Sequence, residues 1–73
     1  MDELTYTKGL YTATASVRLI GQGQFQGVVT LTRDDGGDTD DTVYEVEAAS
    51  PDEAEALEEA KALAHRILGE IEL

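Results

Sequence analysis

Residues 48–73 read AASPDEAEALEEAKALAHRILGEIEL, and this stretch decides the fold because it predicts an amphipathic helix with one apolar side. At about 100° per residue, its large apolar residues fall on a single stripe and most of its acidic residues on the opposite side. A helix of this kind must bury its stripe against another element, so the rest of the chain has to supply an apolar surface. The stripe consists of Leu57, Ala60, Ala64, Ile67, Leu68 and Ile71, with Leu63 at its edge.

The helix has a clear start signal at Ser50. Serine is a favoured N-cap residue, and Pro51 would take the first helical position, where a missing backbone N–H costs nothing. Glu53 lies three residues after Ser50 and completes the Ser-x-x-Glu pattern of a capping box. We therefore expect a helix over residues 50–72.

Alternating apolar and polar residues precede the helix and predict β-strands. The first strand covers residues 10–20, and the alternation resumes after a three-residue hairpin loop, Gly21-Gln22-Gly23. A register with Leu19 opposite Phe25 brings the inward residues of one strand opposite inward residues of the other. The spacing Gly21-x-Gly23-x-x-x-Gly27 is not that of a phosphate-binding loop, because it leads into a strand and not into a helix. Roles in the hairpin and in a crowded part of the strand explain these glycines better.

An aspartate-rich segment, residues 33–41 (RDDGGDTDD), is typical of a solvated turn and connects the second strand to a third over residues 42–48. Its aspartates are at 34, 35, 38, 40 and 41, and their spacing does not fit a calcium-binding EF-hand loop. Residues 1–9 show no clear period and are expected to form a mobile leader.

These elements predict an α+β fold with two layers, β-β-β-α: a three-stranded antiparallel meander in the order 1-2-3, packed on one C-terminal helix. We expect a single small domain over residues 1–73, with the leader over 1–9, the sheet over 10–48 and the helix over 50–72, and a complete small protein. The expected core is Tyr11, Ala15, Val17, Leu19, Phe25, Val29, Leu31, Tyr44, Val46, Leu57, Ala60, Ala64, Ile67, Leu68 and Ile71.

Composition excludes several classes of function. The formal net charge is −11, from 16 acidic and 5 basic residues, and it repels nucleic acid and anionic membrane surfaces. The chain has no Cys and one His, so a zinc site built from these residues is impossible. His65 has no second metal ligand of its kind, and no acid, base or nucleophile falls in a recognisable catalytic pattern. We expect a cytoplasmic protein that is not an enzyme and that has no cofactor, metal, nucleic-acid partner, membrane contact or small-molecule substrate.

Two surfaces of the predicted sheet remain for a partner. The first strand is an edge without charge, Pro or Gly from Leu10 to Val17, and its backbone groups form a template for another strand. The alternative is that residues 4–7 fold back to shield this edge, or that the edge stays exposed. The outer face of the sheet carries small and apolar groups that another sheet or helix could cover. The candidate protein-binding residues are Thr12, Thr14, Ser16, Ile20, Val28, Thr30 and Val43.

We therefore expect a non-enzymatic, acidic protein-interaction module that self-associates, as a homodimer, through the edge of strand 10–20 or through the outer face. The chain is too small to bury a large core alone, which favours help from another chain. The alternative is an acidic mimic of nucleic acid, or a regulator, that binds a basic protein surface. Glu55, Glu58 and Glu59 on the helix and the loop aspartates motivate that alternative.

Overall fold

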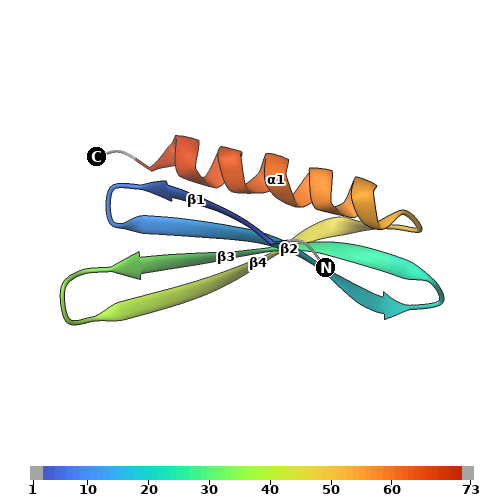
Figure 1. Cartoon of the computed structure of the whole chain (residues 1–73), viewed down its shortest axis with the longest axis horizontal. Coiled ribbons are helices and arrows are strands. Elements are labelled where there is room, and N and C mark those ends of the chain that lie inside the picture. The colour runs from blue at the N-terminus through green and yellow to red at the C-terminus, as the bar shows by residue number, and fades with distance from the viewer. Residues whose placement is uncertain (1–2, 72–73) are drawn as a thin grey trace.

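The computed structural model describes residues 3–71, which form one four-stranded antiparallel sheet followed by one helix (Figure 1). The helix lies along one face of a strongly twisted sheet, and the described part of the chain measures 41 × 21 × 19 Å. Each strand pairs with the next one along the chain, in the order β1-β2-β3-β4. The elements are β1 (Leu4–Lys8), β2 (Tyr11–Gly21), β3 (Gln24–Asp34), β4 (Thr39–Ser50) and α1 (Glu53–Glu70).

The α+β class is confirmed, whereas the prediction of three strands is wrong because the expected leader contains a fourth. β1 pairs with β2 from Leu4 opposite Ala15 to Lys8 opposite Tyr11. Gly9, with φ +60°, allows the tight turn between the two strands. Residues 1 and 2 of the predicted leader lie outside the described residues.

The register predicted for the central hairpin is confirmed. Leu19 lies opposite Phe25, and Ala15 lies opposite Val29. The hairpin loop is shorter than predicted, because Gly21 already pairs with Gln24 and a bulge follows Leu19. The two remaining loop residues, 22 and 23, both have positive φ, as a type I′ turn requires.

The predicted nine-residue aspartate turn is wrong in length, because both flanking strands continue into it. Asp34 pairs with Thr39, so the connection between β3 and β4 contains only residues 35–38. The N–H of Gly36 donates to the Asp34 carboxylate at 3.3 Å, which is the local aspartate bonding typical of turns. β4 is therefore longer than the predicted strand 42–48, and it is one of the two edge strands of the sheet, with β1 as the other.

The helix begins three residues later than predicted, and the expected capping box at Ser50 is wrong. Ser50 pairs with Phe25 as the last residue of β4, and its buried hydroxyl accepts a hydrogen bond from the N–H of Asp52. Asp52 is the actual N-cap, since its carboxylate accepts from the N–H of Ala54 at 3.0 Å. The helix ends at residue 70, and the predicted end at residue 72 lies outside the described residues.

The side of α1 that faces the sheet is rotated slightly from the predicted stripe. Its buried residues are spaced four apart and three of them are alanines: Ala56, Ala60, Ala64 and Leu68. Alanines allow the helix to approach the sheet closely, and Gly27 of β3 completes this contact. A Cβ at position 27 would lie 2.7 Å from the carbonyl oxygen of Ala56 and 3.0 Å from the Cβ of Ala60.

The core is consequently made mostly of small residues, and the larger apolar side chains surround it. The buried members of the expected core are Ala15, Val17, Val29, Ala60, Ala64 and Leu68. The half-buried ones are Tyr11, Phe25, Leu31, Val46, Leu57, Ile67 and Ile71. Two expected core residues are exposed. Leu19 (61%) lies near the end of the β2–β3 hairpin, and Tyr44 (38%), opposite the buried Val29, lies on the edge strand β4.

Candidate protein-interaction surfaces

The edge predicted for partner binding is covered by another strand over residues 11–15. β1 pairs with Tyr11–Ala15 of β2, so this part of β2 is an interior part of the sheet with a partner strand on each side. Residues 11–15 therefore have no free edge for a second chain, whereas residues 16–19 of β2 pair with β3 alone within residues 3–71. The sequence left open whether residues 4–7 fold back on this edge or the edge stays exposed. In the structure, residues 4–8 form β1 and cover residues 11–15.

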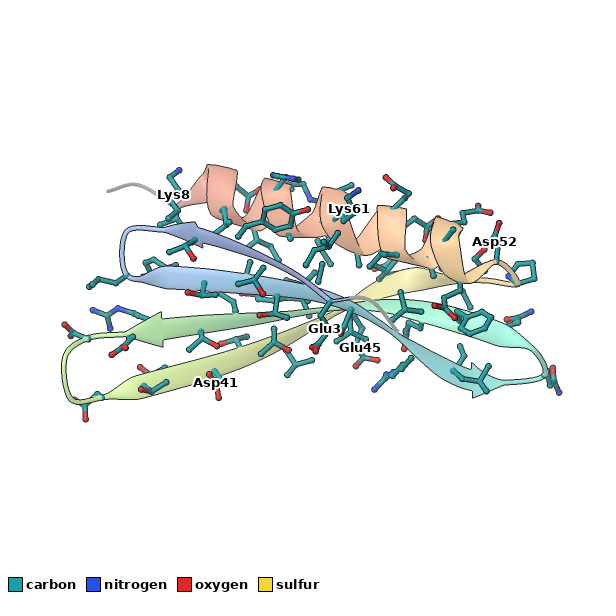
Figure 2. The ribbon with its side chains drawn as sticks, viewed as in Figure 1. Glu3, Lys8, Asp41, Glu45, Asp52 and Lys61 are labelled. Carbon is teal, nitrogen blue, oxygen red and sulfur yellow. The ribbon has the colours of Figure 1, made fainter. Side chains whose placement is uncertain are left out.

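The contacts of β1 with α1 fix it in this position. Lys8 reaches the end of α1 and its ammonium group donates to the carbonyl oxygens of Leu68, at 2.9 Å, and Ile71, at 3.1 Å (Figure 2). The last turn of the helix has no basic residue of its own, so Lys8 supplies the positive charge that a helix C-terminus favours. The Tyr6 ring packs against the His65 ring with centroids 4.4 Å apart and the ring planes tilted by 51°.

The outer face of the sheet, opposite the helix, brings most of the predicted binding residues together. Thr14 pairs with Thr30 on its β3 side, and Thr30 pairs with Val43 of β4, which makes one continuous row across the sheet. Ser16 pairs with Val28 in the adjacent row. Thr12 pairs with Thr32 in the row on the other side of Thr14 and Thr30.

The sequence prediction missed three further threonines that complete this surface. Thr5 and Thr7 of β1 lie opposite Thr14 and Thr12, and Thr32 of β3 lies opposite Thr12. Two rows of three threonines thus cross β1, β2 and β3. We call this surface the threonine face: Thr5, Thr7, Thr12, Thr14, Ser16, Val28, Thr30, Thr32 and Val43.

A polar cluster borders the threonine face and separates it from Ile20, the remaining predicted binding residue. Arg18 forms an ion pair with Glu45 across β3 and also donates to the Gln26 side chain at 2.7 and 3.0 Å. Gln26 in turn donates to the backbone carbonyl of Val46 at 3.0 Å. Ile20, 46% exposed, lies beyond this cluster near the end of the β2–β3 hairpin.

A groove between β4 and α1 is a surface that the sequence prediction did not identify. Its volume is about 760 Å³. Its β4 wall includes a bulge, because three residues, 46–48, lie opposite the single residue Gly27. The lining residues are Glu45, Val46, Glu47, Ala48, Glu59, Ala62, Leu63 and Arg66. The helix residues of the groove follow one another at intervals of three and four, which the sequence could have indicated. The bulge in β4 has no such signal in the sequence.

The aspartates of the β3–β4 hairpin do not converge. Asp34, Asp40 and Asp41 belong to the paired strands, and Asp35 forms an exposed ion pair with Arg33 at 3.4 Å. Among residues 3–71, no group of three or more acidic or His side chains is placed to hold a metal ion. Within the same residues, no helix is both long and apolar enough to span a membrane.

Comparison of the chain with family models, with curated proteins and with solved structures gave no match. Any functional conclusion therefore depends on the surfaces described above.

Proposed function

We propose that this chain is a non-enzymatic protein-interaction module that forms a homodimer through the threonine face. The observation that carries the proposal is the lack of charge on this face in a chain of net charge −11. Two strongly acidic copies repel each other at most orientations, and the repulsion is smallest where uncharged surfaces meet. Within residues 3–71, acidic residues border the face at Asp41 and Glu45 of β4 and at Glu3, which lies two residues before Thr5.

The composition of the threonine face suits contact with a second sheet. Sheets pack face to face about 10 Å apart through small and β-branched side chains. Val43 is exposed and supplies apolar area, and the threonine methyl groups add to it, whereas Val28 is already buried. A standard interface buries about 800 Å² on each partner, which is about one sixth of the 4696 Å² surface of the described chain.

A second candidate function is binding to a basic protein surface, which the acidic composition favours. The two groups of acids that motivated this alternative lie apart. Glu55, Glu58 and Glu59 belong to the first half of α1, whereas the β3–β4 hairpin lies at the opposite end of the long axis (Figure 1). They do not form one continuous array, so a phosphate mimic would have to use either group alone.

Sedimentation equilibrium tests the homodimer. At about 0.5 M NaCl, where long-range repulsion is screened, the mass should approach twice the 7.9 kDa of one chain. Thr30→Glu places a charge at the centre of the threonine face and should keep the chain monomeric. Thr14→Lys should do the same with a charge of the opposite sign.

Ala54→Glu is the matched control, because it adds the same charge as Thr30→Glu at an exposed helix residue away from the face. It should leave the dimer intact. Circular dichroism of each variant checks that the fold is retained. A folded wild-type chain with a mass of 7.9 kDa at micromolar concentration and about 0.5 M NaCl would exclude the proposal.

A further inference from the structure

We infer that the groove between β4 and α1 binds a basic, extended segment of a partner protein, which adds to the sheet as a further strand beside β4. This inference is independent of the proposed homodimer, because the groove lies at the sheet edge and on the helix side. The segment it fits alternates apolar residues with Lys or Arg.

The first support is the free edge of β4. Within residues 3–71, β4 pairs with β3 alone, so the backbone groups on its other side have no partner strand. Strand addition to such an edge is a common way to bind an extended peptide, because backbone hydrogen bonds supply affinity and alternate side chains supply specificity. β4 spans Thr39–Ser50, which is long enough for several such bonds.

The second support is the shape of the groove beside that edge. Side chains of an added strand that point to the helix side would enter the space between Val46 and Leu63. Ala62 and Ala48 are small and leave room there. The volume of about 760 Å³ is in the range of sites that hold peptide side chains or small ligands.

The third support is an unsatisfied acceptor in the groove. The Oε2 oxygen of Glu59 is shielded from solvent and has no hydrogen-bond partner among the described residues. Shielded polar atoms are normally hydrogen-bonded, and leaving one unpaired destabilises a structure. A Lys or Arg side chain of the bound segment would donate to the Glu59 carboxylate once this side chain turns its Oε2 oxygen into the groove. Glu45 and Glu47 of the opposite wall add negative charge that exceeds the one positive charge of Arg66.

Charge also decides between a basic segment and a second copy of this chain. A second β4 beside the first would bring together two strands that each carry Asp40, Asp41, Glu45 and Glu47. Like charges on adjacent strands are destabilising. A basic segment replaces this repulsion with attraction.

Fluorescence anisotropy with a labelled short peptide, in which Val and Lys alternate, tests the inference at about 0.15 M NaCl. The full chain should bind the peptide with micromolar affinity. Glu59→Gln should weaken binding by about tenfold, and Ala62→Trp, which fills the groove from an exposed helix position, should weaken it at least as much. Ala54→Trp and Glu55→Gln are the matched controls outside the groove and should change the affinity less than about twofold.

Peptides methylated on alternate backbone nitrogens test the strand pairing itself. Two such peptides are possible, one methylated on the odd-numbered and one on the even-numbered residues. Each keeps every positive charge but loses the N–H donors on one side of the strand, so at least one of the two should bind about tenfold more weakly than the parent peptide. Equal binding of both methylated peptides and the parent would overturn the inference. So would equal weakening by Glu55→Gln and Glu59→Gln, which would indicate unspecific attraction to an acidic chain.

Ala62→Trp should retain self-association and Thr30→Glu should retain peptide binding, so the two proposals can fail separately.

Discussion

At the scale of single residues, Gly27 determines how closely the helix packs on the sheet. A methyl group at this position would meet the Ala56 carbonyl at 2.7 Å and the Val46 side chain at 2.9 Å. Gly27→Ala should therefore lower the free energy of unfolding by about 1–3 kcal/mol, as overpacked substitutions do. Urea denaturation followed by circular dichroism measures the change.

Gly69→Ala is the matched control for this substitution. Position 69 lies in the last turn of α1 and has nothing within 4 Å of an added Cβ. Alanine should raise the stability there by up to about 1 kcal/mol because of its higher helix propensity. Equal stability of the Gly27→Ala variant and the wild type would contradict the close packing.

Lys8 is the second residue whose role is specific enough to test. Lys8→Met keeps the aliphatic stem and removes the donor to the carbonyls of Leu68 and Ile71, so it should destabilise the fold by about 1 kcal/mol. Lys61→Met removes the same charge from an exposed pair with Glu58 and should cost clearly less. Thermal unfolding of the two variants compares them, and equal shifts would show that only net charge matters.

The sequence indicates the crowding at Gly27 but not the role of Lys8. A glycine inside an alternating strand points to a close approach by another element. A lysine 60 residues before the carbonyl that it caps carries no local signal. Its position follows from pairing of β1 with β2, which the sequence prediction did not include.

At the scale of elements, β1 was missed because its pattern is short. Leu4 and Tyr6 alternate with Thr5 and Thr7, which is a period of two over only four residues. The turn signal Gly9 follows directly and could have supported a hairpin. The central hairpin was predictable in register because its alternation continues over eleven residues in each strand.

The start of α1 shows how a tertiary contact overrides a local signal. Ser50 satisfies the rules for a helix cap, but its pairing with Phe25 places it in the sheet. Asp52→Ala should consequently destabilise the fold by about 1 kcal/mol, because the N–H of Ala54 loses its acceptor. Chemical denaturation checks this against Glu55→Ala, which removes the same charge from the first turn. An equal effect of the two substitutions would reject Asp52 as the cap.

At the scale of the whole molecule, the net charge of −11 should make stability depend on salt. Repulsion among the acids disfavours the compact state, and added salt screens it. We expect the melting temperature to rise by at least about 5 °C between about 0.05 and about 1 M NaCl. A double substitution, Asp40→Asn with Asp41→Asn, should reduce this rise. Thermal unfolding followed by circular dichroism measures it, and a melting temperature that does not change with salt would contradict the expectation.

The arrangement of surfaces is the part of the molecule that the sequence predicted least well. Alternation correctly assigned Thr12, Thr14 and Thr30 to the side opposite the helix, because a strand has only two faces. The groove could not be predicted, since it arises from the bulge opposite Gly27 and from the placement of α1 beside β4.

The most direct test of the central claim is cross-linking through a single introduced cysteine. The described chain contains no cysteine, so Thr30→Cys carries one thiol at the centre of the threonine face. A short bifunctional maleimide spans the roughly 10 Å expected between packed sheets. We predict a covalent dimer of twice 7.9 kDa for Thr30→Cys and a monomer for Ala54→Cys, whereas equal yields for the two variants would contradict self-association through this face.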